Sequence, residues 1–437
     1  MSKTEASWKH RIRMFVSLGD NGSFRRSAIT LTTGTAIAQT LPLALYPVFT
    51  RFFSPEQFGV YATVSFVSTL AAMLATGQYE GTLILAPSRR VASHIVAYIL
   101  MRSAFVFAGL TVLIGIIIRT KLRIAIDPFV MSGLSAVPVI AAATATFSTY
   151  TEWCVRGSRF SELATVRVWQ ASATSACRLL LGAIGVGGNG LVASDLIGRS
   201  LASIRCAVAF WKTDKVYLSV QSFPRIRAAA NQHSRVAKFL LPDQLVSVLG
   251  GSLHVVILGT AFGAESLGYV SVVSSALYAP ITVVSSAVKD VFRQRAAVEY
   301  VRDGSCRATY RRLMLPLIAI ATLGFGTFYA VAPSMFPVIF GQKWAVASDF
   351  ARILTPMFFF NFVSMSLGGV LVIAERSDVS LAWQVSGLIL TGAALAVGAF
   401  IFKQLTTALW LMSLVRAASY AAYMVLSYHY AQRPEAG

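Results

Sequence analysis

The sequence is poor in charged residues, and this scarcity excludes an ordinary soluble protein. Only 13% of the 437 residues are Asp, Glu, Lys or Arg, whereas a soluble domain carries about 25%. The hydrophobic share is 56% and the mean hydropathy is +0.65. Apolar runs of about 20 residues, long enough to cross a membrane core of about 30 Å, recur along the chain. The composition therefore predicts an all-α integral membrane protein.

Acidic residues are scarcer than basic ones. The chain has 18 Asp and Glu against 38 Lys and Arg, which gives a net charge of +20. In a soluble protein this excess would suggest a nucleic-acid partner, but here the basic residues lie mostly between hydrophobic segments. No zinc-knuckle spacing or helix-turn-helix pattern accompanies them. We therefore expect no nucleic-acid partner and interpret the charge as a determinant of membrane topology.

Cysteine is rare, and the common catalytic motifs are absent. No cysteine lies in a CxxC pair or at metal-ligand spacing from a histidine, so we expect free thiols at all four positions: Cys154, Cys177, Cys206 and Cys306. The chain has no GxSxG, HExxH, P-loop or dinucleotide-binding motif. We therefore expect a protein that is not an enzyme and that holds neither a metal nor a cofactor.

The apolar runs predict twelve transmembrane helices. Their expected bounds are 28–49, 60–86, 95–118, 129–149, 163–186, 190–211, 238–260, 269–288, 313–334, 349–373, 379–400 and 406–428. The connections between these runs are short. We expect the helices to form one bundle in two six-helix lobes around a central cavity.

Lys and Arg are distributed unevenly between the two sides of the membrane. With the amino terminus inside, 25 of the 38 lie on the cytoplasmic side (counting Lys238 at a span edge), 6 lie on the opposite side and 7 lie within spans. This bias predicts a bacterial inner-membrane protein with both termini in the cytoplasm. The tail would be 429–437. In the amino-terminal segment 1–27, an apolar face predicts a helix lying on the membrane surface, formed by Trp8, Ile12, Phe15 and Val16.

A short sequence pattern occurs twice. Phe53-Ser-Pro-Glu-Gln-Phe-Gly59 and Phe262-Gly-Ala-Glu-Ser-Leu-Gly268 share Phe, Glu and Gly at equal spacing, and both lie between two apolar runs. A duplication of six helices would explain this, and internal repeats are typical of transporters. The predicted units are an N-lobe at 28–211, a basic cytoplasmic linker at 212–237 and a C-lobe at 238–428.

Seven arginines and no lysines lie inside the predicted spans. They are Arg102, Arg167, Arg178, Arg199, Arg205, Arg352 and Arg416. An arginine at the membrane centre costs about 2.5–3.5 kcal/mol, so these side chains should avoid lipid. Arg167, Arg205 and Arg352 lie near span ends, where their stems can carry the charge to the interface.

Three of these arginines lie near the middle of a span. For Arg178, Arg199 and Arg416 we expect an inward, water-filled cavity that attracts an anion, and we place Arg102 with them as a candidate substrate-binding residue. The alternative is neutralisation by buried ion pairs. Asp195 and Arg199, for example, are four residues apart on one helical face.

Carboxylates inside the spans are candidates for coupling to a proton or sodium gradient. These are Glu80, Asp195 and Asp243. For Glu80 and Asp243, an ion pair near a span end explains the residue equally well. His254 is a lone histidine in its span, which is more often a hydrogen-bonded bundle residue than a proton relay.

Several segments together resemble the Wzx-type polysaccharide flippases of the multidrug/oligosaccharidyl-lipid/polysaccharide exporter superfamily. The stretch from Pro47 to Tyr61, including Arg51, is similar to the opening motif of that family. Gln78-Tyr-Glu80-Gly-Thr-Leu-Ile-Leu-Ala-Pro87 resembles its second-helix exit, and Phe340-Gly-Gln-Lys-Trp344 resembles a later outer turn. The resemblance implies two lobes, alternating access and movement of an undecaprenyl-diphosphate-linked oligosaccharide to the outer leaflet. It also makes Arg51 a candidate contact to the substrate.

Other functions remain open at this point. A drug exporter of the same superfamily would favour acidic residues in its cavity, whereas these spans favour arginine, which suits a diphosphate. A membrane polymerase or ligase that uses the same lipid-linked sugar, or a scaffold for a synthesis complex, are further alternatives. For a flippase we expect the membrane and a lipid-linked oligosaccharide as partners, and other polysaccharide-assembly membrane proteins as candidates. The products would be O-antigen, capsule or exopolysaccharide.

Overall fold

A computed structural model of the chain describes residues 22–120, 128–187, 189–217 and 222–432. The predicted surface helix at Trp8, Ile12, Phe15 and Val16 lies outside these residues. Within them the chain is helical, and the only β contact is one isolated bridge between Ser305 and Gln432.

Long helices follow one another along the described chain. Their bounds are α2 Gly22–Phe52, α3 Pro55–Thr76, α4 Arg89–Thr120, α5 Pro128–Leu134, α6 Val137–Arg156, α7 Phe160–Ala183, α8 Gly190–Asp214, α9 Phe223–Asp303, α10 Arg307–Phe340, α11 Ala347–Ser366, α12 Val370–Ile373, α13 Ser377–Ala396 and α14 Leu405–Tyr430. Four short elements lie between them: the 3-10 helices η1 Tyr79–Leu85, η2 Lys215–Tyr217 and η3 Gln342–Trp344, and the π-helix η4 Val397–Ile401.

The longest helix, α9, is two helices joined at a glycine. Gly263 has φ 80° and ψ 175°, a conformation that is open to glycine and closed to residues with a side chain. With α9 counted as 223–262 and 264–303, the described residues contain the twelve long helices that the sequence predicts. Among the described residues, and with α9 taken as one helix, eight helices are long and apolar enough to cross a membrane by length and composition. α2, α7 and α8 are not among them, and the last two carry four of the seven arginines that lie inside the predicted spans.

Several predicted boundaries differ from those of the helices, and two of them show why. The span 60–86 ends at Thr76, because Gly77 adopts left-handed backbone with φ 59° and the apolar residues beyond it form η1. The predicted linker 212–237 is not a separate connection after residue 222, because α9 begins at Phe223. Apolar composition indicates which segments lie inside the membrane, but it does not indicate the residues at which a helix begins or ends.

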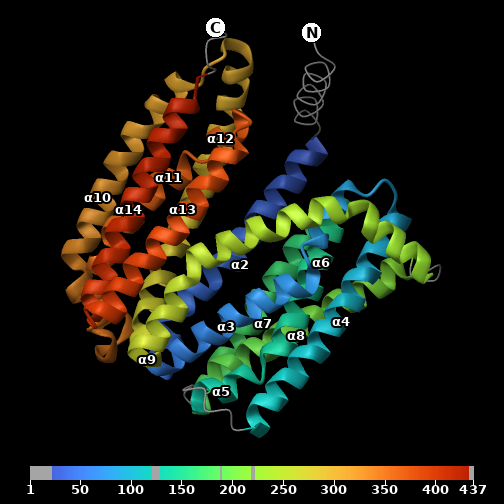
Figure 1. The fold of residues 1–437 in the computed structure, drawn as a ribbon, viewed down its shortest axis with the longest axis horizontal. Coiled ribbons are helices and arrows are strands. Elements are labelled where there is room, and N and C mark those ends of the chain that lie inside the picture. The colour runs from blue at the N-terminus through green and yellow to red at the C-terminus, as the bar shows by residue number, and fades with distance from the viewer. Residues whose placement is uncertain (1–21, 121–127, 188, 218–221, 433–437) are drawn as a thin grey trace.

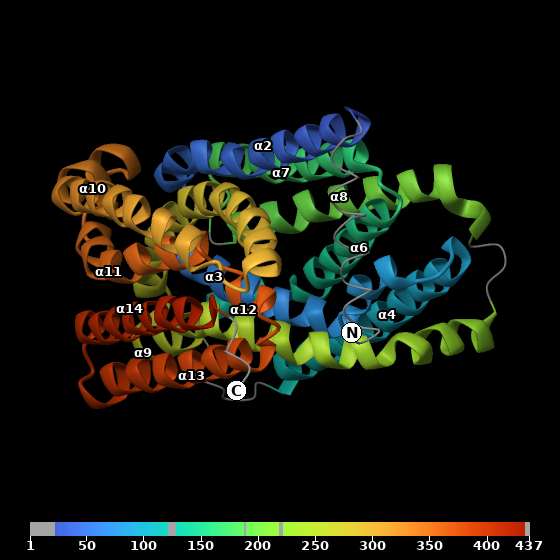
Figure 2. The same ribbon diagram turned by 90° about the horizontal axis from the view of Figure 1, so that it is seen from above.

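The helices form two lobes, with α2–α8 in the N-lobe and α9–α14 in the C-lobe. Figure 1 shows α10, α11, α13 and α14 grouped on one side, with α9 running across to the other. The first part of α9 packs on the N-lobe, where Ala229, Ala230 and Ala237 join the core around Leu83 and Ile95. In Figure 2, α2 and α7 lie side by side along one edge of the bundle. We call the end at which α2 begins and α14 ends the terminal end.

The two copies of the repeated pattern contact each other at the opposite end, which we call the junction end. A Cβ atom on Gly59 would lie 1.7 Å from the carbonyl oxygen of Ala264, and one on Gly268 would lie 1.7 Å from that of Pro55. Residues 55 and 264 are both third in their pattern, and residues 59 and 268 are both seventh. The contact is therefore reciprocal, as expected for two lobes related by a two-fold axis. That the halves superpose remains a prediction.

An aromatic cluster and hydrogen bonds complete the junction. Trp344 is fully buried, with its ring 5.3 Å from that of Phe58 in the N-lobe and 5.7 Å from that of Tyr269 in the C-lobe. Its indole nitrogen donates to the carbonyl of Thr50 at 2.9 Å. Lys343 donates to the carbonyl of Arg51 at 3.1 Å. The lobes are thus joined tightly at the junction end.

A cavity of about 320 Å³ lies between the lobes beside this junction. Side chains of α2 and α3 line it from the N-lobe, and both parts of α9 line it from the C-lobe. Phe58 belongs both to its wall and to the aromatic cluster of the junction. We call this space the inter-lobe cavity. It is the central cavity that the predicted architecture requires.

Candidate functional site

A polar pocket of about 480 Å³ lies inside the N-lobe. Helices α2, α7 and α8 form most of its wall, and Tyr61 of α3 and Phe147 of α6 complete it. Along α7 the lining positions recur at i, i+3, i+4, i+7, i+8 and i+11, so they share one face of the helix. They are Arg167, Gln170, Ala171, Thr174, Ser175 and Arg178. We call this space the arginine pocket.

Three arginines and one carboxylate line the arginine pocket. Asp195 accepts from Arg199 Nε at 2.8 Å and lies 3.6 Å from Arg178 Nη2. Arg167 donates to the hydroxyl of Thr35 at 2.9 Å. The ion pair suggested by the spacing of Asp195 and Arg199 is therefore present, but it leaves a formal excess of two positive charges among these groups.

Arg178 is the most constrained of the three. Its Nη2 donates to the Tyr61 hydroxyl at 2.6 Å, and its guanidinium lies 4.8 Å from the ring of Tyr61 and 5.7 Å from the ring of Phe49. Its side chain is 11% exposed. The buried Nε has no hydrogen-bond partner among the described residues. The group is thus held rigidly with a donor to spare, which suits an anionic ligand.

Arg416 lies in a different pocket, in the C-lobe. It donates to the carbonyl of Gly250 at 2.8 Å, and its guanidinium lies 5.4 Å from the ring of Tyr420. The pocket, of about 240 Å³, is bounded by α9, α13 and α14. The structure therefore corrects the grouping of Arg178, Arg199 and Arg416 in one cavity. The three arginines were grouped because each lies near the middle of its span, and that depth does not show whether residues line the same cavity.

Two other candidate substrate contacts lie away from both pockets. Arg102 donates to the carbonyl of Leu74 at 3.0 Å and covers the end of α3, where a basic side chain stabilises exposed carbonyl groups. Arg51 is exposed at the junction end, with Nη2 3.4 Å from the carbonyl of Val338. Both residues have structural roles here, and neither lines the arginine pocket or the inter-lobe cavity.

Of the carboxylates considered for ion coupling, Asp195 lines the arginine pocket. Glu80 lies in η1, beyond the end of α3 at Thr76, although the predicted span 60–86 included it, and it accepts from the Thr76 hydroxyl at 3.0 Å. Asp243 is half-buried on α9 and lines neither the arginine pocket nor the inter-lobe cavity. His254 lines the inter-lobe cavity.

The arginines assigned to the interface divide into two settings. Arg205 is exposed, with its guanidinium 5.3 Å from the ring of Trp169. Arg352 is half-buried and lies 4.4 Å from the ring of Tyr329. Arg167, expected to snorkel, instead lines the arginine pocket. Arg167 and Arg178 are eleven residues apart, about three helical turns, so they lie on one face of α7.

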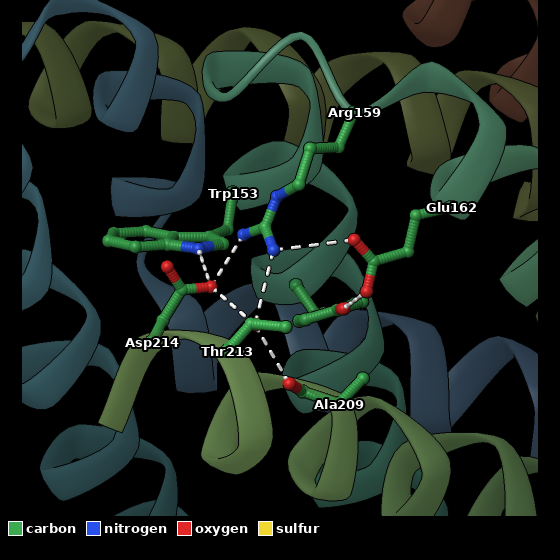
Figure 3. A network of polar contacts seen from close by, with 7 residues as sticks. Trp153, Arg159, Glu162, Ala209, Thr213 and Asp214 are labelled. Carbon is green, nitrogen blue, oxygen red and sulfur yellow. Dashed lines mark hydrogen bonds and ion pairs between the residues drawn. The ribbon is translucent and has the colours of Figure 1, made fainter. Parts of the chain in front are cut away.

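Sequence reasoning missed a polar network at the terminal end of the N-lobe, shown in Figure 3. The Asp214 carboxylate, at the end of α8, accepts from Arg159 at 2.6 Å and from the Trp153 indole of α6 at 3.1 Å. Arg159 also pairs with Glu162 of α7 at 3.3 Å. The spacing of Arg159 and Glu162 is visible in the sequence, but Trp153 and Asp214 are 61 residues apart. The network fastens α6, α7 and α8 behind the arginine pocket.

The surroundings of Asp214 favour its charged form. Asp214 lies beyond the predicted span 190–211. Burial raises the pKa of its carboxyl, but hydrogen bonds from Thr213, Arg159 and Trp153 outweigh burial and hold the pKa below its usual value. A depressed pKa stabilises the fold above the pKa of the unfolded chain, and this stabilisation is lost as pH falls through the folded value. At neutral pH the network is fully formed.

Replacing Asp214 by alanine should destabilise the N-lobe by about 2–4 kcal/mol, because it leaves the Arg159 guanidinium and the Trp153 indole without their buried acceptor. Thermal unfolding of the detergent-solubilised protein measures the effect. Asp378→Ala is the matched control, since that carboxylate pairs with Arg376 on an exposed surface and its loss should leave the unfolding temperature unchanged. Equal unfolding temperatures for the two variants would contradict a fastening role.

Solved transport proteins share this fold. Lipid II flippase MurJ, in an inward closed conformation, matches with a TM-score of 0.72 at 10% identity, over 91% of this chain and 87% of that one. A multidrug resistance MATE family transporter of the MOP superfamily, in an inward-facing conformation, matches with a TM-score of 0.60 at 12% identity, over 91% and 92%. At these identities the likeness concerns the fold of a multi-pass membrane protein and not the substrate.

Sequence comparison identifies the family. A curated relative, the teichuronic acid biosynthesis protein TuaB of Bacillus subtilis (strain 168), is 25% identical over 187 residues, which is 42% of this chain and 38% of that protein. The match thus spans well under half of the relative. The family model described as polysaccharide biosynthesis protein matches residues 48–349, from the end of α2 into α11. This chain therefore belongs to the polysaccharide biosynthesis protein family.

Proposed function

We propose that the chain is a flippase that moves an undecaprenyl-diphosphate-linked oligosaccharide from the inner to the outer leaflet of the bacterial inner membrane. The arginine pocket carries this proposal, because three guanidinium groups and only one carboxylate line it, inside a membrane-spanning lobe. Guanidinium binds phosphate through a planar fork of donors. A bound anion also lowers the free-energy cost of placing the guanidinium charge inside the membrane.

A drug or small-cation exporter of the same fold is the nearest rival. A cation would favour a pocket with an excess of carboxylate, and the charge of the arginine pocket has the opposite sign. The teichuronic acid relative also favours a saccharide substrate over a drug. A polymerase or ligase would need catalytic groups on its outer surface. We assign no catalytic site to the described part of this chain.

The contacts between the lobes support alternating access. The junction end is closed by the reciprocal glycine contact and by Trp344. If the termini are cytoplasmic, this state is closed to the outside, and export requires the junction to separate. In this scheme the substrate enters from the terminal end. Asp195, held between two arginines, is the carboxylate best placed to couple transport to an ion gradient.

The topology predicts that the terminal end faces the cytoplasm. A cysteine introduced at Arg227, exposed near the start of α9, should react with a membrane-impermeant maleimide only after the cells are opened, because the basic residues around it favour the cytoplasmic side. A cysteine introduced at Lys403, exposed at the junction end, should react in intact cells. The reverse labelling pattern would overturn the assignment of the two sides.

Depletion of the protein tests the function itself. Cells that lose the chain should accumulate lipid-linked oligosaccharide in the cytoplasmic leaflet, where it is inaccessible to an external glycosidase, and should stop exporting polysaccharide. Accumulation in the outer leaflet would indicate a polymerase or ligase instead. Unchanged polysaccharide together with increased drug sensitivity would indicate a drug exporter.

A further inference from the structure

The wall of the inter-lobe cavity is chemically different from that of the arginine pocket. Eight of its fourteen lining residues carry a hydroxyl group, and four are Phe or Tyr, with both tyrosines counted in each set. None of the fourteen is Asp, Glu, Lys or Arg. Hydroxyls that donate and accept, set among aromatic faces, suit an uncharged ligand rich in hydroxyl groups.

Hydrogen-bonding capacity in this cavity is left unused. Ser271 Oγ is buried and has no hydrogen-bond partner among the described residues. The Tyr61 oxygen accepts from Arg178, which leaves its own proton free to donate. Thr69 donates to the carbonyl of Ser65, which leaves its hydroxyl oxygen free to accept. Buried polar groups are costly without partners, so a bound ligand would satisfy them.

The inter-lobe cavity adjoins the arginine pocket through a shared wall. Tyr61 lines both spaces, and its hydroxyl is bonded to Arg178. In a lipid-linked saccharide the first sugar is bonded directly to the diphosphate, so a sugar site must lie next to a diphosphate site. The two cavities have this arrangement.

We propose that the inter-lobe cavity binds the sugar residues next to the diphosphate, through hydroxyls of α3 and α9 such as Ser65 and Ser271. This inference rests on the proposed flippase function and adds a second subsite to it. Because the ligand would contact both lobes, its sugars fit the cavity only for some positions of one lobe relative to the other. An acyl chain would leave the hydroxyls unsatisfied, and a cation would find no carboxylate in this wall.

The test compares two lipids in vesicles that contain the purified full chain. One is lipid-linked oligosaccharide extracted from the cells that make the protein, and the other is undecaprenyl diphosphate without sugar. Ser65→Ala/Ser271→Ala removes two hydroxyls from the cavity. The control is Ser68→Ala/Ser286→Ala, which removes two hydroxyls from the same helices away from the cavity, since neither serine lines it.

The cavity variant should transfer the oligosaccharide lipid about tenfold more slowly than wild type, because about two neutral hydrogen bonds are lost, and should transfer undecaprenyl diphosphate at the wild-type rate. The control variant should match wild type with both lipids. Equal slowing of both lipids by the cavity variant, or no slowing of either, would overturn the sugar subsite. Failure of the wild-type protein to transfer the oligosaccharide lipid would instead refute the flippase function.

Discussion

Gly59→Ala should nearly abolish polysaccharide export while the protein remains abundant in the membrane. The new methyl group would lie 1.7 Å from the carbonyl oxygen of Ala264, which is backbone and cannot move aside as a side chain can. Overpacking of this kind costs about 1–3 kcal/mol or more, and the cost falls only on the state in which the junction is closed. At about 3 kcal/mol the closed state would lose more than 100-fold in population relative to the open one. Gly268→Ala should behave alike, since it meets Pro55 in the same way.

The distance between the lobes at the junction end separates this effect from misfolding. Spin labels at Val186 in the N-lobe and Val338 in the C-lobe, both exposed, should move apart in Gly59→Ala. Gly324→Ala is the matched control, because a Cβ there meets no atom within 4 Å, and both the distance and export should stay at wild-type values. Wild-type export from the Gly59→Ala/Gly268→Ala double variant would contradict a gate at the junction.

Arg178→Ala should lower export by about 10- to 100-fold, the loss expected for hydrogen bonds between a guanidinium and an anion. Arg178→Lys should recover part of the activity, because lysine keeps the charge but not the planar fork. Arg199 still pairs with Asp195 in both variants, so no buried carboxylate is left alone. Comparing the two variants therefore separates the effect of Arg178 on export from its effect on the stability of the helix bundle. Export of finished polysaccharide, normalised to membrane abundance, is the measurement.

Two further variants sharpen this result. Arg205→Ala is the control, since Arg205 is exposed against Trp169, and it should export normally. The triple variant with alanine at Arg178, Arg199 and Arg416 should export nothing. Wild-type export from the triple variant at normal abundance would refute anion binding by these residues, and loss of the protein itself would favour a role in folding alone.

Hydropathy was sufficient to predict the helices but not their ends. A lipid-facing helix needs a long apolar run, and most of the long helices carry that signal. α7 and α8 do not, and they were predicted from apolar runs that charged residues interrupt. The points at which helices end or bend depend instead on the local backbone conformation. Gly77 ends α3 within an apolar stretch, and Gly263, with its non-helical backbone, makes the kink between the two parts of α9. Neither feature changes the hydropathy.

The arginine pocket was predicted only in part, because spacing reveals the face of one helix and not its neighbours. Arg167 and Arg178 share a face of α7, as their separation required. The contact of Asp195 with both Arg178 and Arg199 depends on how α8 packs against α7, which no local pattern encodes. Arg416 resembles them in depth and charge but lies in the other lobe.

The repeated pattern at 53–59 and 262–268 was the most informative local signal. It predicted equivalent turns in two lobes, and the structure places the two copies against each other through Gly59 and Gly268. The second copy is a kink in α9 and not a separate turn. Contact between the copies could not be predicted, because a repeat implies symmetry without giving the position of its axis.

Transfer of lipid-linked oligosaccharide across the bilayer of vesicles that contain only the purified protein tests the account most directly. The oligosaccharide lipid is placed in the inner leaflet, and its arrival outside is followed by cleavage with an added glycosidase. Wild-type vesicles should expose the lipid, whereas Arg178→Ala and Gly59→Ala vesicles should approach the slow rate of empty vesicles. Exposure at the same rate with wild-type protein, with either variant and without protein would contradict the account.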